Sequence, residues 1–251
     1  MAAIGYDPRS MLRPITIPGL FITGTDTDIG KTLVTGAIAR HLRLRGRNVA
    51  VSKPVASGCV RRREGLVSED AEYLAECADT RHPLDAVCPQ RFEEPLAPAV
   101  AAQRAGAAVD WSAVQWSLDT LSQGADCLLV EGAGGIMVPL DAKTTVLDLI
   151  RELKLPALIV ARPNLGTINH TVLTVDCLRS AGVTVVGVVI NRYPADGAGI
   201  AEETSPRWIE KLAKTQVLCL VPNCTTGVGP PVPTDVMAAI EQVDWESLMI
   251  R

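Results

Sequence analysis

The sequence predicts an α/β fold whose mostly parallel central sheet is covered by helices on both faces. Six short apolar runs occur along the 251-residue chain, and segments with a helical spacing of apolar residues lie between them. The apolar runs are continuous and do not alternate with polar residues, which is typical of parallel strands buried on both faces. With 47% hydrophobic residues, the chain can form one sizeable core.

The expected strands and helices alternate in chain order. The strands are apolar runs at residues 19–24, 48–54, 126–135, 155–161, 183–191 and 217–222. The helices are expected at residues 31–45, 68–78, 110–123, 145–153, 168–181 and 203–214. Ser68 and Asp110 stand at the starts of two of these helices, where their side chains can serve as N-caps.

The chain is expected to form one domain. Residues 1–17 carry scattered Pro, Arg and Gly residues, and we expect them to form a loosely ordered extension. No stretch of residues 18–251 has the composition of a linker, so we assign all of it to a single domain.

Composition excludes several classes of function. The formal net charge is −4, and Arg61–Arg63 is the densest basic run, so we expect no nucleic-acid partner. No apolar stretch approaches the roughly 18–20 residues that span a bilayer, and no targeting segment stands at the N-terminus. We therefore expect a soluble cytoplasmic protein with no membrane partner. The seven cysteines include no C-x-x-C pair, and we expect small, mostly buried hydrophobic residues rather than disulfides or zinc ligands.

The segment GTDTDIGKT, residues 24–32, predicts a phosphate-binding loop. It follows an expected strand and opens an expected helix, as the G-x-x-x-x-G-K-[ST] motif does, although here five residues separate Gly24 from Gly30. Backbone N–H groups at the helix start would bind phosphate oxygens. Lys31 would bridge two phosphates, and the Thr32 hydroxyl would bind Mg²⁺. The alternative is a plain strand-to-helix turn with a capping threonine.

Other polar residues follow the expected strands, at the sheet edge where ligands bind in such folds. Lys53 and Ser57 lie in KPVASG, where Lys53 could bring a second anion to the phosphate or be an ordinary surface lysine. Glu131 begins EGAGG, a position typical of an acid that binds a metal ion. Asp70 is a further candidate metal ligand, or only a residue that favours a helix start.

Two later segments could bind other parts of a ligand. PNLGTINH, residues 163–170, is a glycine loop at a helix start, which suits a carboxylate or is an ordinary capped loop. Within it, His170 is better explained by packing than by catalysis. Asn191 can present a donor and an acceptor to a base edge, or is a turn residue before Tyr193.

Over about residues 19–225, six features of the chain resemble the motifs of dethiobiotin synthetases in their order and spacing. They are GTDTDIGKT, KPVASG, SEDA, EGAGG, LGTINH and the asparagine after a strand. The five-residue gap in the phosphate-binding loop is the form this family has. The resemblance implies a P-loop NTPase fold and an ATP- and Mg²⁺-dependent ligase of biotin synthesis. Such an enzyme joins 7,8-diaminononanoate and CO2 into dethiobiotin through a carbamate and a carbamic–phosphoric anhydride, releasing ADP and phosphate.

The resemblance also implies roles for individual residues. Catalysis would involve Lys31, Lys53, Thr27 and Ser57, and Mg²⁺ would be held by Thr32, Asp70 and Glu131. ATP would be bound by Asp28, Ile29, Gly30, Lys31, Thr32, Leu33, Asn191, Pro222 and Asn223. The diamine substrate would be bound by Thr27, Lys53, Ser57, Gly134, Leu165, Gly166, Thr167 and Asn169. The last four would act across a homodimer interface.

Two features of the chain depart from the family pattern. Ala99 stands where the family often has His, and the last 25 or so residues match no family pattern.

Two other functions compete with that of a dethiobiotin synthetase. An amide-forming ligase, such as the synthetase part of cobyrinic acid diamide synthase, usually carries a glutaminase domain that has no counterpart here. A partitioning ATPase typically has an extra lysine early in its loop, where Thr25–Thr27 stand.

Overall fold

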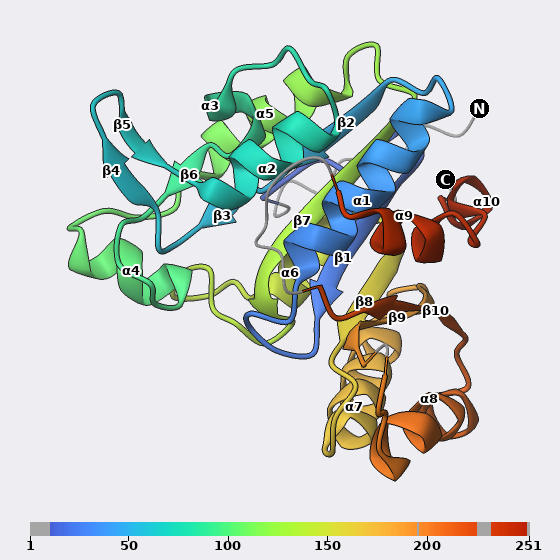
Figure 1. The fold of residues 1–251 in the computed structure, drawn as a ribbon. Coiled ribbons are helices and arrows are strands. Elements are labelled where there is room, and N and C mark those ends of the chain that lie inside the picture. Colours follow the sequence, from blue (N-terminus) through green and yellow to red (C-terminus); the bar gives the residue numbers. More distant parts are fainter. Residues whose placement is uncertain (1–10, 195, 225–231, 250–251) are drawn as a thin grey trace, which may run out of the picture.

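The central sheet has six parallel strands, as the sequence predicts. A computed structural model describes residues 11–194, 196–224 and 232–249. The strand order is β10-β9-β8-β1-β7-β2, and every pairing is parallel (Figure 1). The strands are β1 (Gly19–Gly24), β2 (Val49–Ser52), β7 (Cys127–Gly135), β8 (Ala157–Ala161), β9 (Val185–Tyr193) and β10 (Val217–Pro222). All six expected strands are confirmed, with small shifts at their ends.

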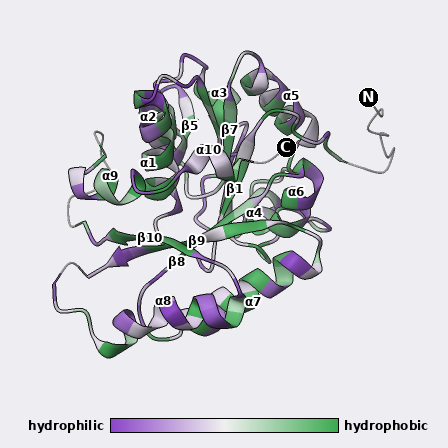
Figure 2. Cartoon of the chain, turned by 90° about the vertical axis from the view of Figure 1, so that its right-hand side faces the viewer, coloured by the Kyte–Doolittle hydropathy of each residue, from purple (hydrophilic) through white to green (hydrophobic). Residues whose placement is uncertain are grey.

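Helices cover both faces of this sheet, which confirms the predicted fold class. The six expected helices are α1 (Lys31–Leu44), α2 (Glu69–Cys77), α5 (Trp111–Ser122), α6 (Val146–Leu153), α7 (Thr167–Ser180) and α8 (Ile200–Ala213). In Figure 2, α1 and α9 (Thr234–Ile240) lie on the opposite side of β8–β10 from α7 and α8. Both predicted N-caps are confirmed, since Ser68 Oγ accepts from the Ala71 N–H and Asp110 Oδ1 from the Ser112 N–H.

The sequence did not predict several short elements. They are β3 (Val55–Ala56), β4 (Val60–Arg62), β5 (Gly65–Val67), β6 (Gln90–Arg91), α3 (Leu84–Val87), α4 (Pro98–Arg104), α9 and α10 (Trp245–Leu248). Strands of two or three residues and helices of one or two turns are too short to show a periodic pattern. The basic run Arg61–Arg63 lies in the β4–β5 hairpin, where Arg61 pairs with Glu93 and Arg62 with Glu72.

The part of the expected N-terminal extension that the structure describes is packed on the domain. Leu12 is 2% exposed and belongs to the hydrophobic core. The Ile15 N–H donates to the Leu153 carbonyl, 3.0 Å away. Residues 11–17 are therefore not loosely ordered, and the packed domain begins before residue 18. Residues 1–10 lie outside the described range.

The sheet and its helices bury the apolar residues, and Figure 2 shows the strands as mostly hydrophobic. All seven cysteines are free thiols; five are buried, and Cys177 and Cys224 are partly exposed. The burial of these five confirms that the cysteines are mostly buried, as expected. Among the described residues, no helix is both long enough and apolar enough to cross a bilayer.

A histidine in a small cavity is expected to make the stability of the protein depend on pH. The cavity, of about 280 Å³, lies between α1 and the C-terminal helices. His41 lines it and is 8% exposed. Burial lowers the pKa of His41, and nearby Arg45 lowers it further. The unfolded chain therefore binds this proton more readily, and the stability from neutral His41 is lost as the pH falls below about 6.5. We expect His41→Gln to lose less thermal stability than the parent between about pH 7 and 5.

Melting temperatures across this pH range test the effect, with His82→Gln as the matched control. Identical slopes for His41→Gln and the parent would contradict it.

Candidate functional site

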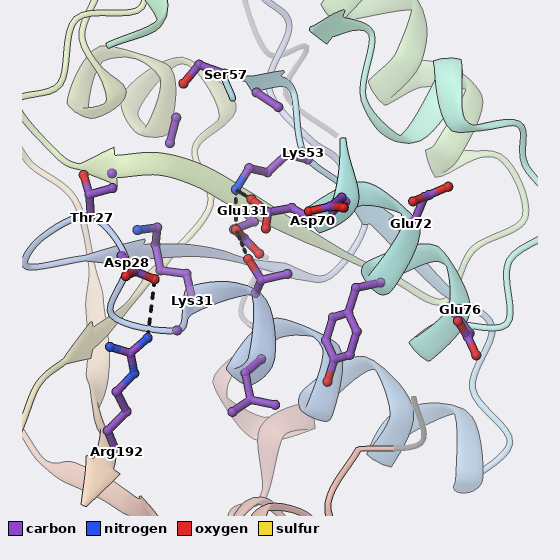
Figure 3. Close-up of a pocket in the computed structure, with 18 of the residues that line it drawn as sticks. Thr27, Asp28, Lys31, Lys53, Ser57, Asp70, Glu72, Glu76, Glu131 and Arg192 are labelled. Carbon is purple, nitrogen blue, oxygen red and sulfur yellow. Dashed lines mark hydrogen bonds and ion pairs between the residues drawn. The ribbon is translucent and has the colours of Figure 1, made fainter. Parts of the chain in front are cut away.

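A cavity of about 640 Å³ lies at the carboxyl ends of β1, β2 and β7. Its walls come from the GTDTDIGKT loop, the KPVASG segment, the start of α2 and the EGAGG segment (Figure 3). Parallel strands that end at one edge bring together these segments, which lie up to about a hundred residues apart in the chain. The cavity is therefore built from four of the segments that the sequence analysis singled out.

The GTDTDIGKT loop joins β1 to α1 in the shape that binds anions. Gly30 precedes the first turn of α1 with φ +85°, and no side chain caps the free N–H groups of that turn. Lys31 is 6% exposed, and its Nζ donates to the Asp26 carbonyl at 3.1 Å. Burial lowers the pKa of Lys31 to about 8, and the attraction of Glu131 offsets this only in part. A phosphate placed here would satisfy both the N–H groups and this lysine.

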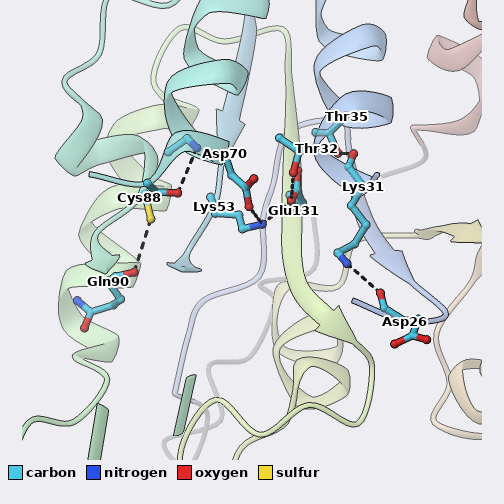
Figure 4. A network of polar contacts seen from close by, with 11 residues as sticks. Asp26, Lys31, Thr32, Thr35, Lys53, Asp70, Cys88, Gln90 and Glu131 are labelled. Carbon is cyan, nitrogen blue, oxygen red and sulfur yellow. Dashed lines mark hydrogen bonds and ion pairs between the residues drawn. The ribbon is translucent and has the colours of Figure 1, made fainter. Parts of the chain in front are cut away.

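Lys53 is a buried cation at the centre of a polar network (Figure 4). Its Nζ donates to Asp70 Oδ2 at 2.7 Å and to Glu131 Oε1. Thr32 Oγ1 donates to the same Glu131 oxygen at 2.9 Å. Burial by itself would lower the pKa of Lys53, but the two carboxylates raise it above its usual value. For Asp70, burial by itself would raise the pKa, but the charge and hydrogen bond of Lys53, together with Thr32 and Lys31, lower it. Lys53 is thus held as a cation inside the cavity.

Glu131, Asp70 and Thr32 have the chemistry of a magnesium site. Glu131 is fully buried, and its Oε2 has no hydrogen-bond partner in the structure. Carboxylate and hydroxyl oxygens are the ligands that Mg²⁺ prefers, with phosphates and water completing its shell. The described residues contain no group of three or more His, Cys, Asp or Glu side chains placed to hold a metal ion. The three side chains therefore fit Mg²⁺ bound together with a nucleotide, rather than a cage made by protein alone.

Most of the other predicted site residues in or next to these four segments also line the cavity. They are Thr27, Asp28, Leu33, Ser57 and Gly134. Gly134 has φ +66°, and a Cβ there would lie 2.8 Å from Val138 Cγ2 and 3.1 Å from Thr27 Oγ1. Thr27 and Gly134 thus face each other across a narrow gap. The side chain of Ile29 is buried instead, and Ile29 does not line the cavity.

Asn191 lies next to the phosphate-binding loop. Its side chain is 1% exposed, and Nδ2 donates to the Ile29 carbonyl at 2.8 Å. Its Oδ1 is buried without a hydrogen-bond partner. Pro222 ends β10 beside β9, and the N–H of the next residue, Asn223, donates to the Tyr193 carbonyl at 2.8 Å. None of these three residues lines the cavity, and residues 225–231 lie outside the described range.

The predicted carboxylate-binding segment does not reach this cavity. Gly166 precedes α7 with φ +98°, so the expected glycine loop at a helix start is present. Leu165 is 88% exposed and Asn169 is exposed, whereas Thr167 is buried beside Thr171. His170 Nδ1 lies 3.4 Å from an Arg162 nitrogen. None of Leu165, Gly166, Thr167 and Asn169 lines the cavity of the same chain.

The cavity also contains residues that the sequence analysis missed. Arg192 lies beside Asp28, with 3.4 Å between its guanidinium and the carboxylate (Figure 3). The cavity wall on the α2 side is formed by Arg62, Glu69, Glu72, Tyr73 and Glu76. A helical spacing from Asp70 to Tyr73 and Glu76 could have indicated this face of α2, but no local signal pointed to Arg62 or Arg192.

The fold and this site define a P-loop nucleoside triphosphatase, because a glycine loop with G-K-T at a helix start faces an acidic residue at the end of a neighbouring strand. A family model described as an AAA domain matches residues 18–230. MinD of Pyrococcus horikoshii, solved with Mg-ADP, has the same fold at 17% identity, with a TM-score of 0.57 over 90% of this chain and 94% of that one. A ParA-family ATPase of Chlorobium tepidum has a TM-score of 0.56 at 13% identity, over 92% and 99%.

Curated relatives define the family more narrowly. Two proteins named ATP-dependent dethiobiotin synthetase BioD are 38% identical (Thermodesulfovibrio yellowstonii) and 43% identical (Anaeromyxobacter sp. strain K). Those matches cover 82% and 81% of this chain and 89% of each relative. The relative of the same name in Bacillus subtilis strain 168 is 39% identical over 82% of this chain and 87% of its own length. The chain belongs to the dethiobiotin synthetase family.

Proposed function

We propose that this protein is a dethiobiotin synthetase that uses ATP and Mg²⁺ to join CO2 and 7,8-diaminononanoate. The observation that supports it best is the placement of Lys31 and Lys53 in one cavity, with Thr27 and Ser57 on its walls. An enzyme that phosphorylates an anionic substrate has to bring two anions together, and two buried lysines provide the positive charge for this. Family membership supports the same reaction.

The proposed chemistry has three steps. One amine of the substrate adds to CO2 and loses a proton, which gives a carbamate. A carbamate oxygen attacks the γ-phosphorus of ATP, the bond to the β-phosphate oxygen breaks, and ADP leaves. The second amine then attacks the carbonyl carbon of this mixed anhydride, expels phosphate and loses a proton, which closes the five-membered urea ring. Lys53 would hold the carbamate, Lys31 the transferred phosphoryl group, and Thr27, Ser57 and Gly134 would orient the carbamate region.

Bound Mg²⁺ would neutralise phosphate charge, and Thr32, Asp70 and Glu131 are the residues proposed to hold it. We expect Glu131→Gln to raise the Mg²⁺ concentration for half-maximal activity by at least about tenfold, because a neutral amide is a weaker ligand than a carboxylate. A magnesium titration of the initial rate measures this. Glu152→Gln, which changes a carboxylate outside the cavity, is the control. An unchanged titration of Glu131→Gln would refute the metal assignment.

Asn191 is proposed to recognise the base, together with the backbone around Pro222 and Asn223. Its buried, unpartnered Oδ1 is an acceptor that suits the amino group of adenine. Because the same side chain also holds Ile29, Asn191→Ala should weaken ATP binding in two ways. We expect the KM for ATP to rise by about tenfold or more, with little change in the KM for the diamine. Steady-state kinetics test this, and equal KM values in parent and variant would remove the assignment.

We further propose a cytoplasmic homodimer in which LGTINH completes the partner's substrate site. Leu165 is 88% exposed and Leu173 on α7 is 60% exposed, so this face of the subunit carries apolar side chains that a second copy could cover. Backbone N–H groups at the start of α7 would bind the substrate carboxylate. Light scattering measures the mass, and Leu173→Glu is expected to lower it to that of one subunit.

The proposed function is tested by phosphate release from Mg·ATP with bicarbonate, with and without 7,8-diaminononanoate, and by mass detection of dethiobiotin. Release that requires the diamine and yields dethiobiotin supports it. Folded protein that binds ATP but shows no diamine dependence refutes it. Stimulation by DNA or membrane vesicles instead would favour the partitioning ATPase, and turnover with another acid or amine would favour the amide-forming ligase.

A further inference from the structure

The last residues of β9 contact the phosphate-binding loop at two neighbouring positions. Asn191 Nδ2 donates to the carbonyl of Ile29, and the Arg192 guanidinium lies 3.4 Å from the carboxylate of Asp28. Neighbouring residues of a regular strand point to opposite faces of the sheet. Two successive residues of β9 therefore should not both reach one loop, and a local irregularity has to explain it.

That irregularity is an extra residue in β9. Leu220 pairs with Ile190, whereas Pro222 pairs with Tyr193, so three steps along β9 pass opposite two steps along β10. Arg192 takes up the extra length in a left-handed conformation, with φ 57°. Such bulges re-aim side chains next to active sites. Left-handed backbone is unfavourable for arginine, so the conformation is maintained by its surroundings.

The loop residue that Arg192 contacts is left-handed as well. Asp28 has φ 53° and Gly30 has φ +85°, so the chain turns sharply just before the first N–H groups of α1. Those N–H groups form the phosphate site, and their direction depends on this turn. Asn191 packs directly against this turn: a Cβ on Gly30 would lie only 2.0 Å from the Asn191 Nδ2. Arg192 contacts it from the cavity side, where its side chain is 51% exposed and that of Asp28 is 91% exposed.

We propose that Arg192 is a positioning residue of the nucleotide site, which acts through Asp28 to keep the turn from Asp28 to Gly30 in its phosphate-binding shape. The inference rests on the proposed binding of ATP at this loop. It assigns Arg192 no contact with the nucleotide itself. Arg192 and Asp28 should therefore contribute to affinity as one unit, so losing either residue should cost what losing both does.

A double-mutant cycle measures this coupling. Because this ion pair is solvent-exposed, we expect Arg192→Gln and Asp28→Asn each to raise the Kd of Mg·ATP by about threefold, and the double variant to raise it by about threefold rather than about tenfold. Arg192→Lys should recover part of the affinity, since a lysine keeps the charge. The KM for ATP should rise with kcat nearly unchanged, which loss of folded protein would not produce. Titration calorimetry gives Kd, and Arg61→Gln, an exposed arginine that pairs with Glu93, is the control.

Three results would overturn the inference. An additive loss of about tenfold in the double variant would mean that Arg192 contacts the nucleotide independently of Asp28. Tighter binding of Mg·ATP by Asp28→Asn would mean that Asp28 only neutralises the charge of Arg192 and does not position the turn with it. An unchanged Kd in Arg192→Gln would leave the pair without a role. Dethiobiotin formation by the parent protein is measured separately, so failure of the proposed function and failure of this coupling are distinguishable.

Discussion

Lys53→Met should lower kcat by at least about a thousandfold while leaving binding of Mg·ATP measurable. Lys53 is the buried cation between Asp70 and Glu131, and its proposed partner is an anion that exists only during the reaction. Lys31 and the N–H groups of the first turn of α1 remain to bind the phosphates. Single-turnover phosphate release and ATP titration separate the two effects. Normal product formation by this variant would remove Lys53 from the mechanism.

The same substitution should also destabilise the protein, which calls for a second variant. Glu131 is fully buried, and loss of Lys53 leaves its charge unpaired, at a cost of about 3–5 kcal/mol. The double variant Lys53→Met with Glu131→Gln removes both charges and should recover most of the melting temperature without recovering turnover. Recovery of both together would mean that Lys53 serves only stability. Lys143→Met, in an exposed loop, is the matched control.

Gly30→Ala should abolish measurable nucleotide binding, with a loss of affinity of at least about a hundredfold. The new Cβ would lie 2.0 Å from Asn191 Nδ2, and φ +85° is unfavourable for alanine. Either the loop or β9 has to move, and both hold the phosphate-binding turn. ATP titration and thermal melting measure the result, and parent-like affinity would contradict the account of this turn.

A second glycine separates backbone strain from the steric clash. Gly46, past the end of α1, has φ +83°, and a Cβ there meets nothing within 4 Å. Gly46→Ala should therefore cost only the left-handed strain, about 1–2 kcal/mol, and leave ATP affinity unchanged. Adding Asn191→Ala to Gly30→Ala removes the clash and should recover part of the thermal stability, short of that of Gly46→Ala because the Ile29 carbonyl loses its partner.

The sequence alone determined the fold class and the phosphate-binding loop. Continuous apolar runs mark strands buried on both faces, and GTDTDIGKT specifies a turn, free N–H groups and a lysine within nine residues. These signals are local, since hydrophobic periodicity and backbone preference depend on neighbours in the chain. The same locality explains why Ser68 and Asp110 were identified as helix caps from sequence.

The tertiary structure alone decided how residues distant in sequence pair with one another. Lys53 meets Glu131 across 78 positions and Asn191 meets Ile29 across 162, and no local pattern encodes such contacts. Leu12 looked like part of a loose extension because its contacts lie in the folded core, not among its neighbours. Arg192 could not be predicted from the sequence for the same reason. The direction of its side chain depends on how β9 pairs with β10, and pairing is not encoded by residue type alone.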